Sequence, residues 1–166
     1  MHGNDKIVQL LLNGGAHVDA RVNHTWTSLI YAAHTGEVET ARVLLDSGAS
    51  IEAKKEGGFT PLLEAAWVDR IPVAQLLVSR GADINSKTER NNLRNYTALH
   101  IAALKDFEEM VRFLLDQGAY SSAKTGEGDT ALDVARRNGR DSVIKLLVKK
   151  DFARSKLRPY LGKLRP

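Results

Sequence analysis

The side chains with the greatest capacity for catalysis or metal binding in this sequence are its histidines, which are His2, His17, His24, His34 and His100. Zinc enzymes often place two histidines one helical turn apart, as in His-Glu-x-x-His, and that run does not occur here. We find no metal-ligand pattern of Asp or Glu around His24 or His34. The sequence contains no cysteine, which excludes thiol catalysis, disulfides and most zinc patterns. We therefore predict neither a metal site nor a cofactor.

Motifs for nucleophilic attack or phosphate binding are also missing from the sequence. The glycines of Gly126-Glu127-Gly128 are not followed by the lysine of a phosphate-binding loop, so we interpret them as turn residues. No Gly-x-Ser-x-Gly segment is present to hold an activated serine. Because an enzyme needs several such groups together, the sequence predicts a protein without catalytic activity.

An internal repeat determines the elements that would position any functional side chain. The segment Thr-Pro-Leu-Leu-Glu-Ala-Ala at residues 60–66 has a counterpart 33 residues earlier, at 27–33, and another 37 residues later, at 97–103. A fourth copy begins at Thr130, 33 residues after the start of the third. A fixed period of this length indicates a stack of similar structural units.

Each unit predicts two helices and a projecting loop. Thr60 can cap the first helix, and Pro61, in the first turn, has no N–H group to lose. Small pairs such as Ala65 and Ala66 allow neighbouring first helices to approach closely. A second helix follows, with Leu and Val at helical spacing, and a glycine such as Gly81 favours a left-handed cap at its end.

This order of helix, short turn, helix and hairpin at a 33-residue period resembles the ankyrin repeat. The resemblance implies an all-α fold, an ankyrin-repeat solenoid of stacked helix-turn-helix units with projecting β-hairpin loops. Departures such as Ser28 and Ala98, which replace the family's proline, are local. The resemblance also implies a structural role for His100. Asn85 lies in a context similar to that modified by asparaginyl hydroxylases, although the same residue is an ordinary hairpin asparagine.

The repeats divide the chain into about five units. We expect an ankyrin repeat domain over residues 1–153, with a partial unit at about 1–20, full units at 21–53, 54–86, 87–123 and 124–153, and a basic C-terminal extension at 154–166. The partial unit contains a second helix without a first one. It is either native or a piece of a longer array, and we expect the latter.

The spacing between units lengthens by four residues before the fourth unit. The added residues lie in the polar, turn-rich segment 87–95, which predicts a longer projecting hairpin. Insertions in repeat proteins often lie on the binding face, but a tolerated loop without a role is equally consistent with this pattern. The last unit carries Arg136 and other basic residues on its helices, as expected of a solvent-facing cap.

The net charge of +4 comes from the end of the chain. Residues 151–166 hold five basic residues and one acidic residue, which leaves 19 of each sign in residues 1–150. The repeat body therefore shows no general preference for polyanions. No run of eighteen apolar residues predicts a membrane span. The lack of cysteine fits a reducing compartment, so we expect an intracellular protein, cytoplasmic or nuclear.

The ankyrin resemblance implies that hairpin tips and first helices line a groove that contacts a partner. The residue before the opening Thr of each unit and the residue after its small pair are bulky in the middle units. Aromatic residues and Arg anchor many interfaces, so we predict an exposed aromatic and apolar strip that binds a peptide or a protein. The alternative is that the aromatic residue before each Thr only supports its hairpin.

The predicted partner-binding residues are Trp26, His34, Phe59, Trp67, Arg94, Tyr96, Leu104 and Arg137. A rim around them is expected from Asn23, Glu56, Arg90, Leu93, Arg94, Glu127 and Arg137. Its mixed charges favour a peptide or protein partner of a monomeric array over nucleic acid. Two other functions stay open. The basic tail could contact nucleic acid or an acidic membrane, or the array could be a targeting or spacer arm of a larger multidomain enzyme.

Overall fold

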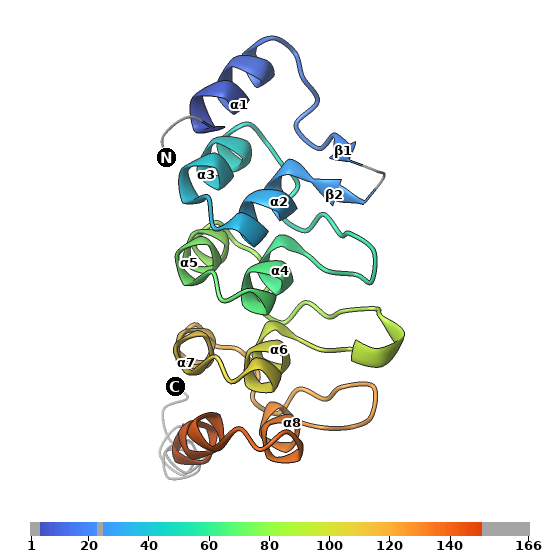
Figure 1. The fold of residues 1–166 in the computed structure, drawn as a ribbon, viewed down its shortest axis with the longest axis vertical. Coiled ribbons are helices and arrows are strands. Elements are labelled where there is room, and N and C mark those ends of the chain that lie inside the picture. The colour runs from blue at the N-terminus through green and yellow to red at the C-terminus, as the bar shows by residue number, and fades with distance from the viewer. Residues whose placement is uncertain (1–3, 23–24, 151–166) are drawn as a thin grey trace, which may run out of the picture.

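The computed structural model describes residues 4–22 and 25–150. The basic extension predicted at residues 154–166 lies outside this part of the chain, as does rim residue Asn23. Within the described part, helices follow one another in pairs along an elongated stack (Figure 1).

The stack consists of two rows of helices. The row of first helices contains α2 (Ser28–Thr35), α4 (Pro61–Trp67), α6 (Ala98–Lys105) and α8 (Ala131–Arg137). The row of second helices contains α1 (Asn4–Asn13), α3 (Val38–Asp46), α5 (Ile71–Ser79), α7 (Glu108–Asp116) and the helical residues 141–150. Loops project to one side of the first helices, and one of them pairs β1 (Arg21–Val22) with β2 (Trp26–Thr27) in antiparallel register (Figure 1). The all-α ankyrin-repeat solenoid predicted from the period is confirmed.

The small residues in the first helices form the contact between neighbouring units. Each first helix packs against the next, α2 on α4, α4 on α6 and α6 on α8. The pairs Ala32/Ala33, Ala65/Ala66 and Ala102/Ala103 are completely buried at these contacts. Without larger side chains between them the helix backbones approach closely, and Leu and Val from the second row complete the core.

The helix ends have the capping chemistry that the sequence indicates. The hydroxyl of Thr60 accepts a hydrogen bond from the Leu63 amide at 3.4 Å, and Pro61 occupies the first turn of α4. Where Gly36 and Gly139 join the two helices of their units, Asp69 and Asp106 take the same left-handed backbone, with φ of 56° and 65°. Aspartate tolerates this conformation better than most residues, so the substitution preserves the turn.

The longer loop before the fourth unit folds back onto the body of the protein. It contains a short 3-10 helix, η1 (Asn91–Leu93), and its ends are held by the Thr88 amide, which donates to the Tyr96 carbonyl at 2.9 Å. Leu93 is buried, so the prediction that it belongs to a rim around the groove is wrong. The four added residues give the loop enough length for an apolar side chain to turn inward.

Candidate functional site

Residues eight positions apart in one unit meet on the side of the stack formed by hairpins and first helices. The ring of Trp26 lies edge-on to His34, with centroids 5.4 Å apart. Phe59 and Trp67 repeat this arrangement at 5.9 Å in the next unit. In the last unit Asp129 and Arg137 occupy the same two positions, and Nη1 of the arginine lies 2.6 Å from the carboxylate. In these three units the two series of residues chosen from the sequence therefore form pairs, which bring a hairpin base against the end of a first helix.

Lysines from the following unit connect these pairs along the stack. Nζ of Lys55 lies 3.8 Å from the ring centroid of Trp26. Lys105 stands over the ring of Trp67 in the same way, at 3.9 Å. An ammonium group over an aromatic face is attracted by its negative quadrupole, which holds both tryptophans in place.

A buried carboxylate lies beneath this cluster. Glu64 projects from α4 with only 1% of its surface exposed. Its Oε1 lies 2.8 Å from Nδ1 of His34. Its Oε2 lies 2.7 Å from Nζ of Lys55, and this contact is an ion pair without the geometry of a hydrogen bond. An ionised carboxylate can only accept, so Nδ1 of His34 carries the proton. The charge of Glu64 is thus balanced by Lys55, and both Lys55 and His34 also contact Trp26.

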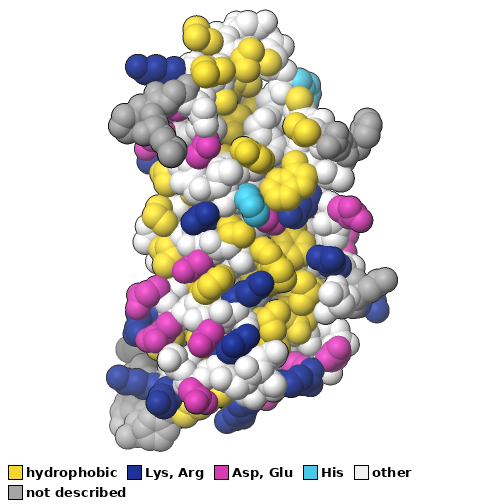
Figure 2. Space-filling model, viewed as in Figure 1, with side chains coloured by type: hydrophobic (Ala, Val, Ile, Leu, Met, Phe, Trp, Pro, Cys, Tyr) yellow, Lys and Arg dark blue, Asp and Glu magenta, His cyan; other side chains and the backbone are white. Residues whose placement is uncertain are grey.

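The cluster surrounds a hollow of about 470 Å³. Its walls contain Trp26, Lys55, Phe59, Glu64 and Trp67, and its outer edge contains Glu56, Glu89 and Arg90 from the hairpins. Figure 2 shows that hydrophobic side chains form a band along this face of the stack, with Lys and Arg beside it. The hollow combines three aromatic rings with charges of both signs in its walls and at its edge, which suits a peptide or protein surface better than a polyanion.

One of the predicted anchors is not exposed. Phe59 retains only 4% of its surface, because it is covered by the edge-on ring of Trp67 and faces Lys55. The prediction that Phe59 is an exposed part of the strip is therefore wrong, and the alternative of a hairpin-supporting role describes it better. Trp26, Trp67 and Tyr96 remain half-buried, each with part of its ring accessible.

The other predicted residues lie further along the stack, outside the hollow. Tyr96 packs against His100 at 5.6 Å, and burial together with the charges of Glu127 and Asp129 raises the pKa of its hydroxyl. Leu104 is half-buried at the end of α6. Arg94 is exposed, and its backbone carbonyl accepts from the Gly126 amide at 2.7 Å, which joins two hairpins.

Arg137 is exposed but engaged within its own unit. Its Nη1 lies 2.7 Å from Glu127 Oε2 in addition to the contact with Asp129. The hydrogen bond to Glu127 and the nearby Asp129 raise the pKa of this guanidinium, which keeps it charged. A partner that contacts Arg137 would therefore also meet the two acidic groups.

Asn85 has a structural role between two units. Its Oδ1 accepts a hydrogen bond from the Tyr120 amide at 3.0 Å. Asp19 and Glu52, at 33-residue intervals before it, accept from the amides of Ser50 and Asp83 in the same manner. The side chain is therefore one step of a ladder that links successive units, and hydroxylation of Asn85 stays a prediction.

His100 is fully buried and linked to the following hairpin. Its Nδ1 faces the Thr97 hydroxyl at 2.9 Å and accepts from the Thr97 amide, while Nε2 faces the carbonyls of Ala123 and Asp129 at 3.1 and 3.2 Å. Carbonyls only accept, so Nε2 carries the proton and the ring is neutral. This contact joins α6 to the hairpin of the last unit, as a structural histidine should.

Acidification is expected to weaken this junction. Burial lowers the pKa of His100, so the folded chain resists a proton that the unfolded chain accepts below about pH 6.5. The stability that depends on the neutral ring is present above that pH and is lost as the pH falls toward the lower folded-state pKa. Urea unfolding at pH 7.5 and 5.5 should show a smaller decrease for His100→Gln than for the parent chain. Equal decreases in both proteins would contradict this role.

Sequence reasoning missed three residues of the site, Lys55, Glu64 and Lys105. Glu64 had a detectable signal, because the equivalent residues of the other units are Tyr31, Ile101 and Val134, and a carboxylate among apolar residues calls for a partner. The two lysines carry no such signal. Their contacts depend on how one unit is placed on the next.

Comparison with known proteins identifies the family. A family profile described as "Ankyrin repeats (3 copies)" matches residues 1–88 and 86–156. The chain therefore belongs to the ankyrin repeat family. Ankyrin repeats are generally protein–protein interaction modules and are typically non-catalytic. The chain is also similar to "Regulatory protein NPR1" from Arabidopsis thaliana, with 44% identity over 46 residues, which are 28% of this chain and 8% of that protein.

Two searches of the described residues give negative results. Across residues 4–22 and 25–150, no helix has both the length and the apolar character to cross a membrane. The same residues contain no group of three or more His, Asp or Glu side chains placed to hold a metal ion.

Proposed function

We propose that this chain is a non-catalytic interaction module that binds a peptide or a protein surface along the side formed by its hairpins and first helices. The observation that supports this most directly is the hollow between the second and third units, where Trp26 and Trp67 are both half-buried and face one space. Half-buried tryptophans held by neighbouring lysines present a large, rigid contact area. Such side chains bind at a low cost in conformational entropy.

In this proposal the bound segment runs along the stack. It contacts Trp26 and Trp67 at the hollow and His34 beside Trp26, and continues over Leu104 and Tyr96 toward Arg94 and Arg137. Phe59 acts from below by fixing the ring of Trp67. Because acidic and basic groups both line the edge of the hollow, as Glu56, Glu89 and Arg90, the preferred partner is a mixed-charge segment with apolar anchors.

A peptide library provides a test without knowledge of the natural partner. Random dodecapeptides displayed on phage are selected against the 166-residue chain, and the dissociation constants of selected peptides are measured by calorimetry. We expect Trp67→Ala and Tyr96→Ala each to weaken binding by about 30-fold, which corresponds to about 2 kcal/mol, if they are hot spots.

Two controls make the result specific. Tyr120→Ala removes another tyrosine, one that is 62% exposed and lies outside the hollow, and should leave affinity unchanged. Circular dichroism should show that all three variants keep the helical content of the parent. Selected peptides that bind all variants equally would reject this surface as the binding site.

A further inference from the structure

The longer loop of the fourth unit, residues 87–95, lies between the hairpins of the third and fifth units (Figure 1). We call it the inserted loop. On one side the Glu89 amide donates to the Gly57 carbonyl at 2.9 Å, and on the other side the Arg94 carbonyl accepts from the Gly126 amide at 2.7 Å. Because both neighbouring hairpins bind its backbone, the inserted loop has a fixed position in the stack.

Two arginines of the inserted loop pass over glycines of these neighbouring hairpins. The Cβ, Cγ and Cδ atoms of Arg90 lie 3.3–3.6 Å from the position that a β-carbon on Gly57 would occupy. The same three atoms of Arg94 lie 3.0–3.3 Å from that position on Gly126. The glycines therefore leave room for both arginine stems, which pack on the hairpins and hold the charged ends near the surface.

The guanidinium groups of both arginines are available to a partner. Arg90 and Arg94 are exposed, and neither forms an ion pair within residues 4–22 and 25–150. The acidic residue of the inserted loop, Glu89, is instead paired with Lys54 at 2.7 Å. The loop thus presents two positioned positive charges that the described part of the chain does not neutralise.

The neighbouring hairpins also carry acidic side chains, which bear on the choice of partner. Glu127 is paired with Arg137 at 2.7 Å. Glu56 is exposed at the outer edge of the hollow. The phosphates of a nucleic acid that followed the hairpins would meet these carboxylates as well as the arginines. A peptide can instead place separate acidic side chains at the two arginines only.

The two arginines lie along the path proposed above for the bound segment. Arg90 lines the hollow together with Trp26 and Trp67. Arg94 precedes Tyr96 by two residues and contacts the hairpin of the fifth unit. A segment that runs along the stack would therefore meet Arg90 beside the hollow and Arg94 beside Tyr96.

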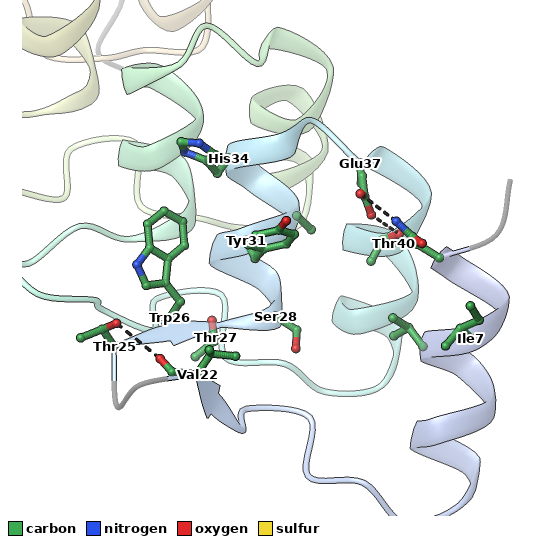
Figure 3. A pocket seen from close by; sticks show the side chains of 13 residues that line it. Ile7, Val22, Thr25, Trp26, Thr27, Ser28, Tyr31, His34, Glu37 and Thr40 are labelled. Atoms are coloured by element: carbon green, nitrogen blue, oxygen red, sulfur yellow. Dashed lines mark hydrogen bonds between the residues drawn. The ribbon is translucent and has the colours of Figure 1, made fainter. Parts of the chain in front are cut away.

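A larger cavity between α1 and α2 does not have this chemistry. Its volume is about 710 Å³, and Figure 3 shows Ile7 and Tyr31 on two sides of it. The described residues that line it include the acidic Glu37 and no lysine or arginine. The complement for an acidic part of a partner is therefore the inserted loop and not this cavity.

We propose that the inserted loop selects an acidic partner, with Arg90 and Arg94 each binding a carboxylate side chain of the bound peptide segment. This inference rests on the binding surface proposed above and adds the charge that this surface recognises. A guanidinium can hold a carboxylate through two parallel hydrogen bonds. Because the arginine stems are already packed on glycines, less side-chain freedom is lost on binding.

The dodecapeptides selected against the 166-residue chain provide the probe. Each selected peptide is compared with an amide form in which every Asp is replaced by Asn and every Glu by Gln. We expect the parent to bind the acidic form about 20-fold more tightly, from two contacts of about fivefold each. Arg90→Gln and Arg94→Gln should each weaken binding of the acidic form by about fivefold and leave the affinity for the amide form unchanged.

Two further variants test the position and the specificity of the charge. Gly126 lacks the left-handed backbone of Gly57, so Gly126→Ala displaces the stem of Arg94 without straining the chain. It should lower the preference for the acidic form at least about twofold. Arg42→Gln removes one positive charge from α3, in the row of second helices, and should change neither affinity. Circular dichroism checks that every variant keeps the helical content of the parent.

The outcomes separate this inference from the binding surface on which it rests. Selected peptides without acidic residues, equal affinity for the two forms, or equal effects of Arg90→Gln on both forms would overturn the charge selection. If such peptides still lose affinity with Trp67→Ala, the binding surface stands without it. Peptides that depend on Arg90 and Arg94 but not on Trp67 or Tyr96 would support the charge selection and reject the aromatic anchors.

Two results would count against the acidic peptide as the occupant. Failure to select any peptide would contradict both proposals. Displacement of a selected peptide by a single-stranded oligonucleotide, lost in Arg90→Gln and Arg94→Gln, would assign the inserted loop to nucleic acid instead.

Discussion

Lys55→Met is expected to lower the free energy of unfolding by about 3 kcal/mol, because it leaves the carboxylate of Glu64 buried with one partner fewer. The side chains of Lys55 and Glu64 are 16% and 2% exposed, so the carboxylate has little contact with water. Loss of a buried pair's partner costs about 3–5 kcal/mol in other proteins, and we take the lower end because His34 still contacts Oε1. Chemical denaturation followed by circular dichroism measures the change.

A second substitution separates the charge from the packing of the lysine. Glu64→Ile combined with Lys55→Met should restore stability to within about 1 kcal/mol of the parent, since apolar residues can replace a buried pair. Isoleucine suits the position because Ile101 occupies its equivalent one unit later and is completely buried.

The neighbouring lysine provides the control for Lys55. Lys54 pairs with Glu89 at 2.7 Å, but both side chains are about half or more exposed, at 48% and 65%. Lys54→Met should therefore change the free energy of unfolding by less than about 0.5 kcal/mol. Similar losses at Lys54 and Lys55 would show that burial of Glu64 is not the cause.

Leu77→Ala is expected to destabilise the chain by about 3 kcal/mol, within the range of about 2–5 kcal/mol for buried leucines. Leu77 lies in α5 with none of its surface exposed and packs between its own first helix and the neighbouring second helices. Truncation removes apolar contacts and leaves a cavity in a region that is close-packed. Because stability in a repeat array is shared between adjacent units, the loss should broaden or split the denaturation curve.

The same substitution in α1, at the end of the stack, should have a much smaller effect on stability. Leu11 holds the same position of the repeat as Leu77 but is 59% exposed, so Leu11→Ala should change stability by less than about 0.5 kcal/mol. Hydrogen exchange can localise the effects, with lost protection in α5 and its neighbours for Leu77→Ala only. Equal destabilisation by both variants would show that the difference in burial between Leu11 and Leu77 does not set their contributions to stability.

The side-chain cluster around Trp26 was predicted from the sequence in part, and the rest of it depends on tertiary packing. The sequence pattern correctly selected Trp26, His34 and Trp67 as residues of one face, because the 33-residue period places equivalent residues side by side. It could not separate an exposed ring from a supporting one, so Phe59 was misassigned. The exposure of an aromatic residue depends on its neighbour in space, which for Phe59 is the ring of Trp67 eight residues later.

The amino-acid sequence by itself determined the family, the repeat period, the order of helices and the small residues at their contacts. These features are local or strictly periodic, and threonine caps, alanine pairs and glycine turns each indicate a local geometry. Only the tertiary structure decided that Glu64 forms an ion pair with Lys55 and a hydrogen bond with His34, that Leu93 turns inward, and that Ile7 and Tyr31 meet at an open cavity. These contacts join residues about 9 to 30 positions apart, and their distances depend on the rise and rotation from one unit to the next, which no single unit encodes.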